Sequence, residues 1–168
     1  EQGFQQTGCT SDECAVEVGD LLGVQYMIAG TIGKVGETFT IDARMVSMET
    51  GVAIRTKQMT YMGKVDGLIN EMRILAYLML EMEPPAKLLA KREGGGALDI
   101  TGEDLEVSGG FIGTSGSTVA VVDFEARGIS ALEAQTLTDR FRTSVATTGV
   151  VRLVERRMMV ELLEEQGF

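Results

Sequence analysis

The stretch TVAVVDF, residues 118–124, decides the fold class of this chain. It is almost continuously apolar, which is typical of a strand buried on both faces of an α/β sheet. The residues that follow predict a helix over 130–147, a second strand in VVRLVE (150–155) and a helix in RRMMVELLEEQGF (156–168). The part of the chain from 118 to 168 is therefore predicted to alternate strand, helix, strand and helix.

The N-terminal half has a different pattern. In TFTIDARMV (38–46), apolar and polar residues alternate, as in a strand with one buried face. The joints KVGE (34–37) and METG (48–51) are short and contain glycine, which is typical of hairpin turns. We therefore predict a three-stranded antiparallel meander over 24–63, followed by a long helix over 64–83. The expected fold class is α/β, with a mixed sheet of two buried strands plus this meander, packed with helices.

The two halves are joined by a segment of different composition. Pro84 and Pro85 end the long helix, since proline cannot continue it. Glycine, serine and acidic residues then dominate, so residues 86–117 are predicted to be a flexible or weakly structured, Gly-rich connector. The halves, 1–85 and 118–168, are predicted to form one domain together.

The tetrapeptide EQGF occurs at 1–4 and again at 165–168. When the halves are joined at this tetrapeptide, the order of elements becomes β-α-β-α-α-β-β-β-α, which is one complete α/β domain. Either half alone leaves an exposed sheet edge. The chain is therefore predicted to be circularly permuted. A natural permutation, an engineered rearrangement, one period of a tandem array and a choice of chain boundaries stay open as origins, and we favour an engineered rearrangement or a choice of chain boundaries.

Composition excludes several classes of function. The net charge is −10, whereas binding to nucleic acid or to an anionic membrane surface requires clustered Lys and Arg. No apolar run approaches the roughly 18–20 residues of a membrane-spanning helix, and no signal peptide is visible, so any export signal has been removed. Histidine is absent, which excludes His-based nucleophile triads and the common His-containing zinc sites.

The two cysteines, Cys9 and Cys14, lie close together in GCTSDEC. Two thiolates without histidine do not make a four-ligand zinc site. Either a small local disulfide or a pair of reduced thiols fits this spacing, and we favour the disulfide. A disulfide in turn favours an oxidising compartment.

The sequence contains no motif that identifies a catalytic, cofactor-binding or metal-binding residue. Asp99, Glu103 and Asp104 resemble a weak calcium site, but they lack the ligand spacing of an EF-hand loop, so a solvated connector is expected. Asp123 ends the first buried strand, where α/β proteins often place a catalytic carboxylate. Because it has no identifiable partner, we expect it to bond locally to the loop Glu125–Gly128. The protein is therefore predicted not to be an enzyme.

A basic cluster near the C-terminus stands out in this acidic chain. Its arginines are interpreted either as solvated charges that pair with Glu155 and Glu161 or as a contact surface for an acidic partner. The methionines that follow are either flexible core filling or part of an adaptable protein interface. The candidate interaction residues are Arg152, Arg156, Arg157 and Met158.

Four phrases carry a resemblance to a known family: VAVVDFEARG (119–128), VVRLVERRMMVELLEEQGF (150–168), AVEVGDLLGVQYMIAGTI (15–32) and IDARMVSMETG (41–51). In permuted order, they resemble the curli production assembly/transport (CsgG-type) family. A similar α/β domain occurs in penicillin-binding-protein activator lipoproteins and in the TolB N-terminal domain. The resemblance implies a protein–protein interaction domain of the bacterial cell envelope, in the periplasm or associated with the outer membrane.

One departure from that family bears on function. Its secretion channels insert long amphipathic hairpins in the strand region, whereas the turns KVGE and METG here are tight. We therefore expect an adaptor or assembly component rather than a channel, with a protein partner or a second copy as ligand. The alternative is a structural subunit that self-assembles into a ring, a filament or a half-exchanging oligomer. A carboxylate-only enzyme is a third hypothesis, but no paired acidic motif supports it.

Overall fold

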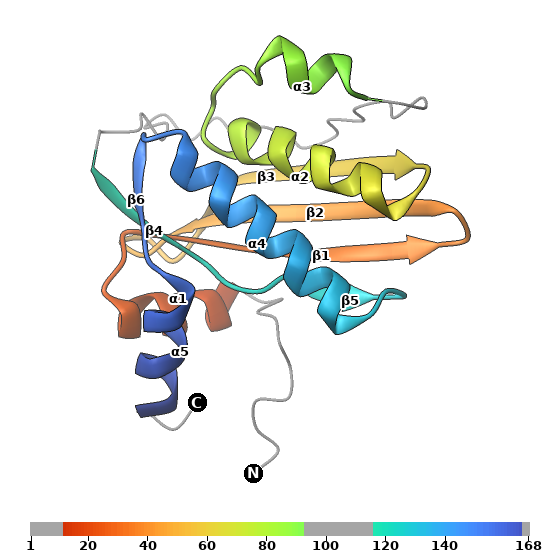
Figure 1. Ribbon diagram of the computed structural model, residues 1–168. Coiled ribbons are helices and arrows are strands. Elements are labelled where there is room, and N and C mark those ends of the chain that lie inside the picture. Colours follow the sequence, from red (N-terminus) through yellow and green to blue (C-terminus); the bar gives the residue numbers. More distant parts are fainter. Residues whose placement is uncertain (1–11, 93–115, 166–168) are drawn as a thin grey trace.

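The computed structural model describes residues 12–92 and 116–165 (Figure 1). Within these residues a six-stranded mixed sheet is packed with five helices. The strands are β1 (Tyr26–Val35), β2 (Thr38–Ser47), β3 (Ala53–Met62), β4 (Ser117–Val121), β5 (Glu125–Arg127) and β6 (Val151–Leu153). The helices are α1 (Asp12–Leu22), α2 (Val65–Met79), α3 (Ala86–Ala90), α4 (Ala131–Thr147) and α5 (Arg156–Glu165).

The sheet joins the two halves of the chain. Its order is β3-β2-β1-β4-β6, and β5 pairs with the far part of β1. The predicted meander is confirmed, because β1, β2 and β3 pair antiparallel through two tight turns. The two strands predicted in the C-terminal half are present: β4 lies between β1 and β6 and is parallel to both. Only β4 is buried as predicted, because β6 lies at the edge of the sheet and exposes Arg152. Strand β5 was not predicted.

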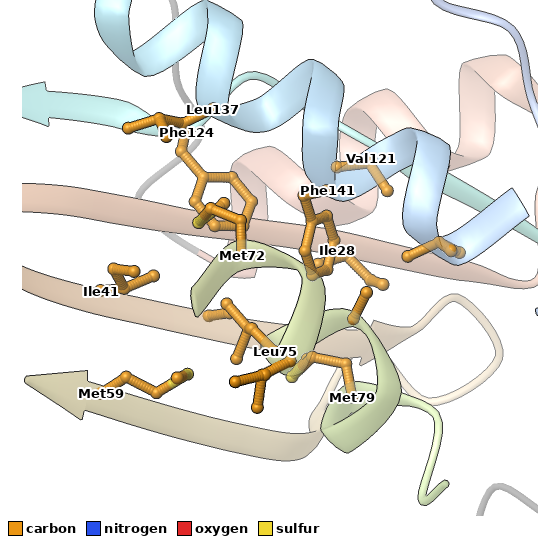
Figure 2. Packing of buried hydrophobic residues seen from close by; sticks show 14 of the residues in the cluster. Ile28, Ile41, Met59, Met72, Leu75, Met79, Val121, Phe124, Leu137 and Phe141 are labelled. Atoms are coloured by element: carbon orange, nitrogen blue, oxygen red, sulfur yellow. The ribbon is translucent and has the colours of Figure 1, made fainter. Parts of the chain in front are cut away.

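The larger core lies between the sheet and the pair of helices α2 and α4 (Figure 2). The ring centroids of Phe124 and Phe141 lie 5.4 Å apart at its centre, and the Met72 side chain from α2 faces them. Apolar residues at helical spacing on the two helices are buried in this layer. They are Leu68, Met72, Leu75 and Met79 on α2, and Ala134, Leu137, Phe141 and Val145 on α4.

A smaller core lies on the other face of the sheet, under α1 and α5. Met27 of β1, Ala120 of β4 and Met159 of α5 belong to it. Side chains alternate along a strand, so Val119 and Val121 point to the larger core while Ala120 points to the smaller one. The run 119–122 is continuously apolar because helices cover both faces of the sheet here.

The start of the predicted connector differs from expectation. Residues 86–90 form helix α3, which is fixed to α2 by specific contacts. The Asn70 side-chain amide donates to the Leu88 carbonyl at 2.9 Å, and Arg92 makes a two-bonded ion pair with Glu71 at 3.0 and 2.8 Å. Residues 86–92 of the predicted connector are therefore held against α2. Residues 93–115 lie outside the described part.

The two ends of the described chain lie on adjacent helices. Helix α1 contacts helix α5, and Figure 1 shows them side by side beneath the sheet. The repeated tetrapeptide itself falls almost entirely outside the described residues. The permuted order therefore stays a prediction.

Candidate interaction surface

Asp123 lies directly after β4 and is held by two arginines. Its Oδ1 accepts from Arg142 Nη2 at 2.9 Å, and its Oδ2 accepts from Arg156 Nη2 at 3.1 Å. The carboxylate side chain is 20% exposed and Arg142 is 8% exposed, so this is a largely desolvated ion pair. The expected local bond from Asp123 to the loop 125–128 is replaced by these long-range contacts. Both carboxylate oxygens are committed to guanidinium groups, which makes Asp123 a structural anchor.

Arg142 connects α4 to the sheet. Besides Asp123, its guanidinium donates to the Val121 carbonyl from Nη2 at 2.6 Å and from Nε at 3.1 Å, and Nη1 binds Asp139 Oδ1 at 2.8 Å. These bonds satisfy a strand-end carbonyl and two carboxylates with one side chain. Charge-assisted bonds of this kind are stronger than neutral ones. The contacts therefore fix α4 relative to β4.

Arg156, the first residue of α5, is used differently from its predicted role. Its guanidinium binds Asp123, and it also binds the side-chain oxygen of Gln135 in the amide orientation that satisfies both groups. Its side chain is 37% exposed. Arg156 therefore orients the start of α5 against α4 and presents only part of its surface to solvent.

The outer face of α5 is the exposed part of the predicted cluster. Arg157 is exposed and pairs with Glu161 one turn later at 3.1 Å, as the solvated-charge interpretation predicts. Met158 is 53% exposed and Val160 is 42% exposed, whereas Met159 between them is buried in the smaller core. Helix α5 thus carries apolar residues on the face that binds the sheet and also on the face that meets solvent.

Arg152 extends this surface to the sheet edge. It is exposed on β6, between Val151 and Leu153, which pack into the larger core. Because strand side chains alternate, Arg152 projects toward the side of the sheet that α5 covers. Arg152 on β6 and Arg157, Met158 and Val160 on α5 are all exposed, and we call this set of residues the α5 surface.

A groove of about 580 Å³ borders the anchoring arginines. It lies between α4 and the junction of β6 with α5, and its lining is mixed in charge. It is lined by Asp139, Arg142, Thr143, Ala146, Thr147, Leu153, Val154, Glu155 and Arg156. Its charged groups include the same side chains that tie α4 and α5 to Asp123, so the groove is a product of that anchoring.

Among the described residues, the carboxyl groups of Asp42 and Glu133 have shifted pKa values. Burial raises the pKa of Asp42 on β2, and a hydrogen bond from Gln58 and the charge of Arg127 oppose that shift. Hydrogen bonds from the Ser130 backbone and side chain lower the pKa of Glu133 at the start of α4. Both groups belong to other elements than α5 and β6, which carry the α5 surface. Asp42 belongs to the polar side of the meander, and Glu133 belongs to a helix cap.

Several sequence candidates fall on residues that the structure does not describe. Cys9 is one of these, so its disulfide with Cys14 stays a prediction; Cys14 itself packs in α1 against the smaller core. The possible calcium ligands Asp99, Glu103 and Asp104 also lie outside the described part. Over residues 12–92 and 116–165, no group of three or more Cys, Asp or Glu residues is placed to hold a metal ion.

Arg142 is the anchoring residue that sequence reasoning missed. It sits one turn after the buried Thr138 and next to the buried Phe141, so the helical period places it on the inner face of α4. A buried cation needs an anionic partner. Asp123, the carboxylate directly after the neighbouring strand β4, was available as that partner. An arginine on the inner face of a helix, together with a carboxylate at a strand end, was therefore the sequence signal for this ion pair.

Comparisons with protein-family models, with curated proteins and with solved structures give no match. In the part of the chain that the structure covers, no helix combines the length and apolar character needed to cross a membrane.

Proposed function

We propose that this chain is a non-enzymatic protein-interaction domain that acts as an adaptor or assembly component in the bacterial cell envelope. The observation that carries the proposal is the α5 surface. Helix α5 is fixed by Met159 and by the Arg156–Asp123 pair, yet it presents Met158 and Val160 to solvent. A rigidly held helix with exposed methionine is suited to protein contacts, because methionine adapts to irregular partner surfaces at low cost.

The charge around these residues supports a protein partner. Arg157 directly precedes Met158 on α5, Arg152 lies on the preceding strand β6, and Glu161 lies on the same helix. Interfaces are commonly built as an apolar centre with a polar rim, and arginine and methionine are enriched in them. The envelope location is supported by the resemblance of 119–128 and 150–168 to the CsgG-type family.

Site-specific photo-crosslinking tests the proposal. A photoreactive residue is placed at Met158 or, as a matched control, at Met62 at the end of β3. Met62 is a methionine of similar exposure, 58% against 53%. After irradiation of source cells, the envelope and soluble fractions are analysed for adducts.

We expect a discrete adduct from position 158 in the envelope fraction and none from position 62. An adduct of the chain with itself favours the self-assembling subunit, which light scattering over a range of concentrations then measures as a growth in mass. Equal labelling from both positions, or none from either, contradicts the proposal.

A further inference from the structure

Positive charge gathers in a second groove, on the side of the sheet that α2 and α4 cover. This groove has a volume of about 340 Å³ and lies where α2, α3 and α4 meet. Four cationic side chains line it, Arg73, Lys87, Lys91 and Arg140, and all of them are exposed. Among the described residues that line it there is no Asp or Glu. We call it the basic groove.

Six other arginines of the chain differ from the four cations of the basic groove in their partners. Arg55, Arg92, Arg127, Arg142, Arg156 and Arg157 each form an ion pair with a carboxylate. Within the described ranges, no carboxylate lies at ion-pair distance from any of the four groove cations. In a chain with 25 acidic and 15 basic residues, such a concentration of positive charge with no carboxylate partner among the described residues is unexpected.

The geometry of the basic groove is fixed by buried contacts beneath it. The Glu71 side chain is 2% exposed and binds Arg92, and Asn70 binds the Leu88 carbonyl. These bonds hold α3 against α2 and keep Lys87 and Lys91, one helical turn apart, beside the groove. Like charges held at this spacing repel one another. An anionic group that binds there removes the repulsion and gains Coulomb energy.

We propose that the basic groove binds an acidic segment of a partner protein. Carboxylate side chains complement the four cations, while Tyr77, Pro85 and Leu88 in the lining offer apolar contacts to the peptide stem. A long polyphosphate is disfavoured, because the net charge of −10 repels phosphates that extend past the groove. A short acidic segment does not extend past the positive charge of the groove, so it avoids this repulsion.

This inference is independent of the α5 surface, which lies with α1 on the opposite side of the sheet. The chain itself contains an acidic sequence that could compete with a partner's acidic segment for the basic groove. The sequence from 93 to 115 carries five acidic residues and no Lys or Arg. They are Glu93, Asp99, Glu103, Asp104 and Glu106. The experiment therefore includes a variant in which these five residues are replaced by Gln or Asn.

Fluorescence anisotropy with a labelled decaglutamate peptide measures binding to the full chain at low and at moderate salt. We expect saturable binding that weakens with salt, and a loss of about tenfold in affinity for the double variant Arg73→Gln/Arg140→Gln. The matched control, Arg152→Gln/Arg157→Gln, removes the same charge from the α5 surface and is expected to change affinity by less than about twofold. Circular dichroism confirms that each variant is folded.

Each other outcome overturns the inference. Equal losses in the two double variants show a response to net charge alone. Tighter binding of a ten-nucleotide oligothymidylate than of decaglutamate shows a nucleic-acid site. Binding only by the variant with neutralised 93–115 shows that the chain's own acidic segment is the occupant, and binding by neither form shows that the groove takes no acidic peptide.

Discussion

Arg142 ties helix α4 to the end of strand β4 through Asp123. Its Nη2 lies 2.9 Å from Asp123 Oδ1 and 2.6 Å from the Val121 carbonyl oxygen, and its side chain is 8% exposed. Arg156 of α5 binds the other oxygen of the same carboxylate. One strand-end carboxylate therefore sets the positions of two helices on opposite sides of the sheet, including the helix that presents the α5 surface.

Replacing Arg142 by methionine is expected to lower the free energy of unfolding by about 3 kcal/mol. The change keeps most of the side-chain volume but leaves the Val121 carbonyl and one oxygen of Asp123 without their buried donor. Urea denaturation followed by circular dichroism measures the loss.

The control for this change is Arg157→Met, which breaks an ion pair of the same type on the exposed side of α5. Exposed pairs contribute little, so its effect is expected to stay within about 0.5 kcal/mol. A loss for Arg142→Met no greater than that of the control contradicts the anchoring role of Asp123.

The central fold was predictable because its signals are local. Alternation over 38–46 and the continuous apolar run over 118–124 each record which faces of one strand are buried, and both are confirmed. Strand β5 and helix α3 were missed because their order comes from distant residues. The strand pairs by backbone with β1, and the helix is held by Asn70 and Glu71.

The anchoring network was predictable only in part. Arg156 was identified as a candidate, yet its partner Asp123 is 33 residues away in sequence, and no local pattern joins them. Arg157 is the opposite case, since its partner Glu161 is one helical turn away and was among the expected pairs. Sequence spacing identifies partners within one helix, whereas partners on different elements require the topology.

Gly30 in the middle of β1 is expected to tolerate no side chain. A Cβ built at this position meets the backbone carbonyl of Asp42 on the neighbouring strand and lies 3.0 Å from the Phe124 ring. Neither neighbour can move freely, because one is sheet backbone and the other is core. Gly30→Ala is therefore expected to cost about 2–3 kcal/mol in unfolding free energy, measured by chemical denaturation.

Gly19→Ala in α1 is the matched control. The Cβ there meets only the flexible Met48 side chain, which can rotate away, and alanine gains about 1 kcal/mol of helix propensity over glycine. We expect a net change of less than about 1 kcal/mol. If both variants lose the same stability, the close approach at Gly30 is not the cause.

The cap of α4 is expected to make stability depend on pH. Ser130 N–H donates to Glu133 Oε2 at 2.8 Å and the Ser130 hydroxyl donates to the same oxygen at 2.9 Å, and these two bonds lower the pKa of Glu133 below its usual 4.5. A carboxylate with a lowered folded-state pKa stabilises the fold above its unfolded-state pKa. That stabilisation is lost as the pH falls through the folded-state value. Wild type should therefore exceed Glu133→Gln in stability at pH 7, and the difference should shrink on acidification to about pH 3.

The same comparison in a Ser130→Ala background is the control. Removing the Ser130 hydroxyl is expected to cost about 1 kcal/mol and to take away one of the two hydrogen bonds that lower the pKa of Glu133. The effect of Glu133→Gln on the pH dependence should then be smaller. An unchanged effect means that Ser130 is not its cause.

The contact between α1 and α5 predicts that the chain can be opened between α3 and β4 and closed through EQGF. A rearranged chain begins at Gly116, runs to Phe168, continues from Gln5 and ends at Arg92, so that EQGF occurs once. Ten residues, 166–168 and 5–11, join α5 to α1 in this chain. Ten residues reach at most about 35 Å, which is ample between helices in contact. Because chain ends close in space permit permutation, we expect cooperative unfolding with a free energy within about 2 kcal/mol of the parent.

The control is a chain opened instead between Asp42 and Ala43, inside the central strand β2. Urea denaturation should show no cooperative unfolding for this control. If the rearranged chain behaves like that second variant, the predicted permutation is wrong.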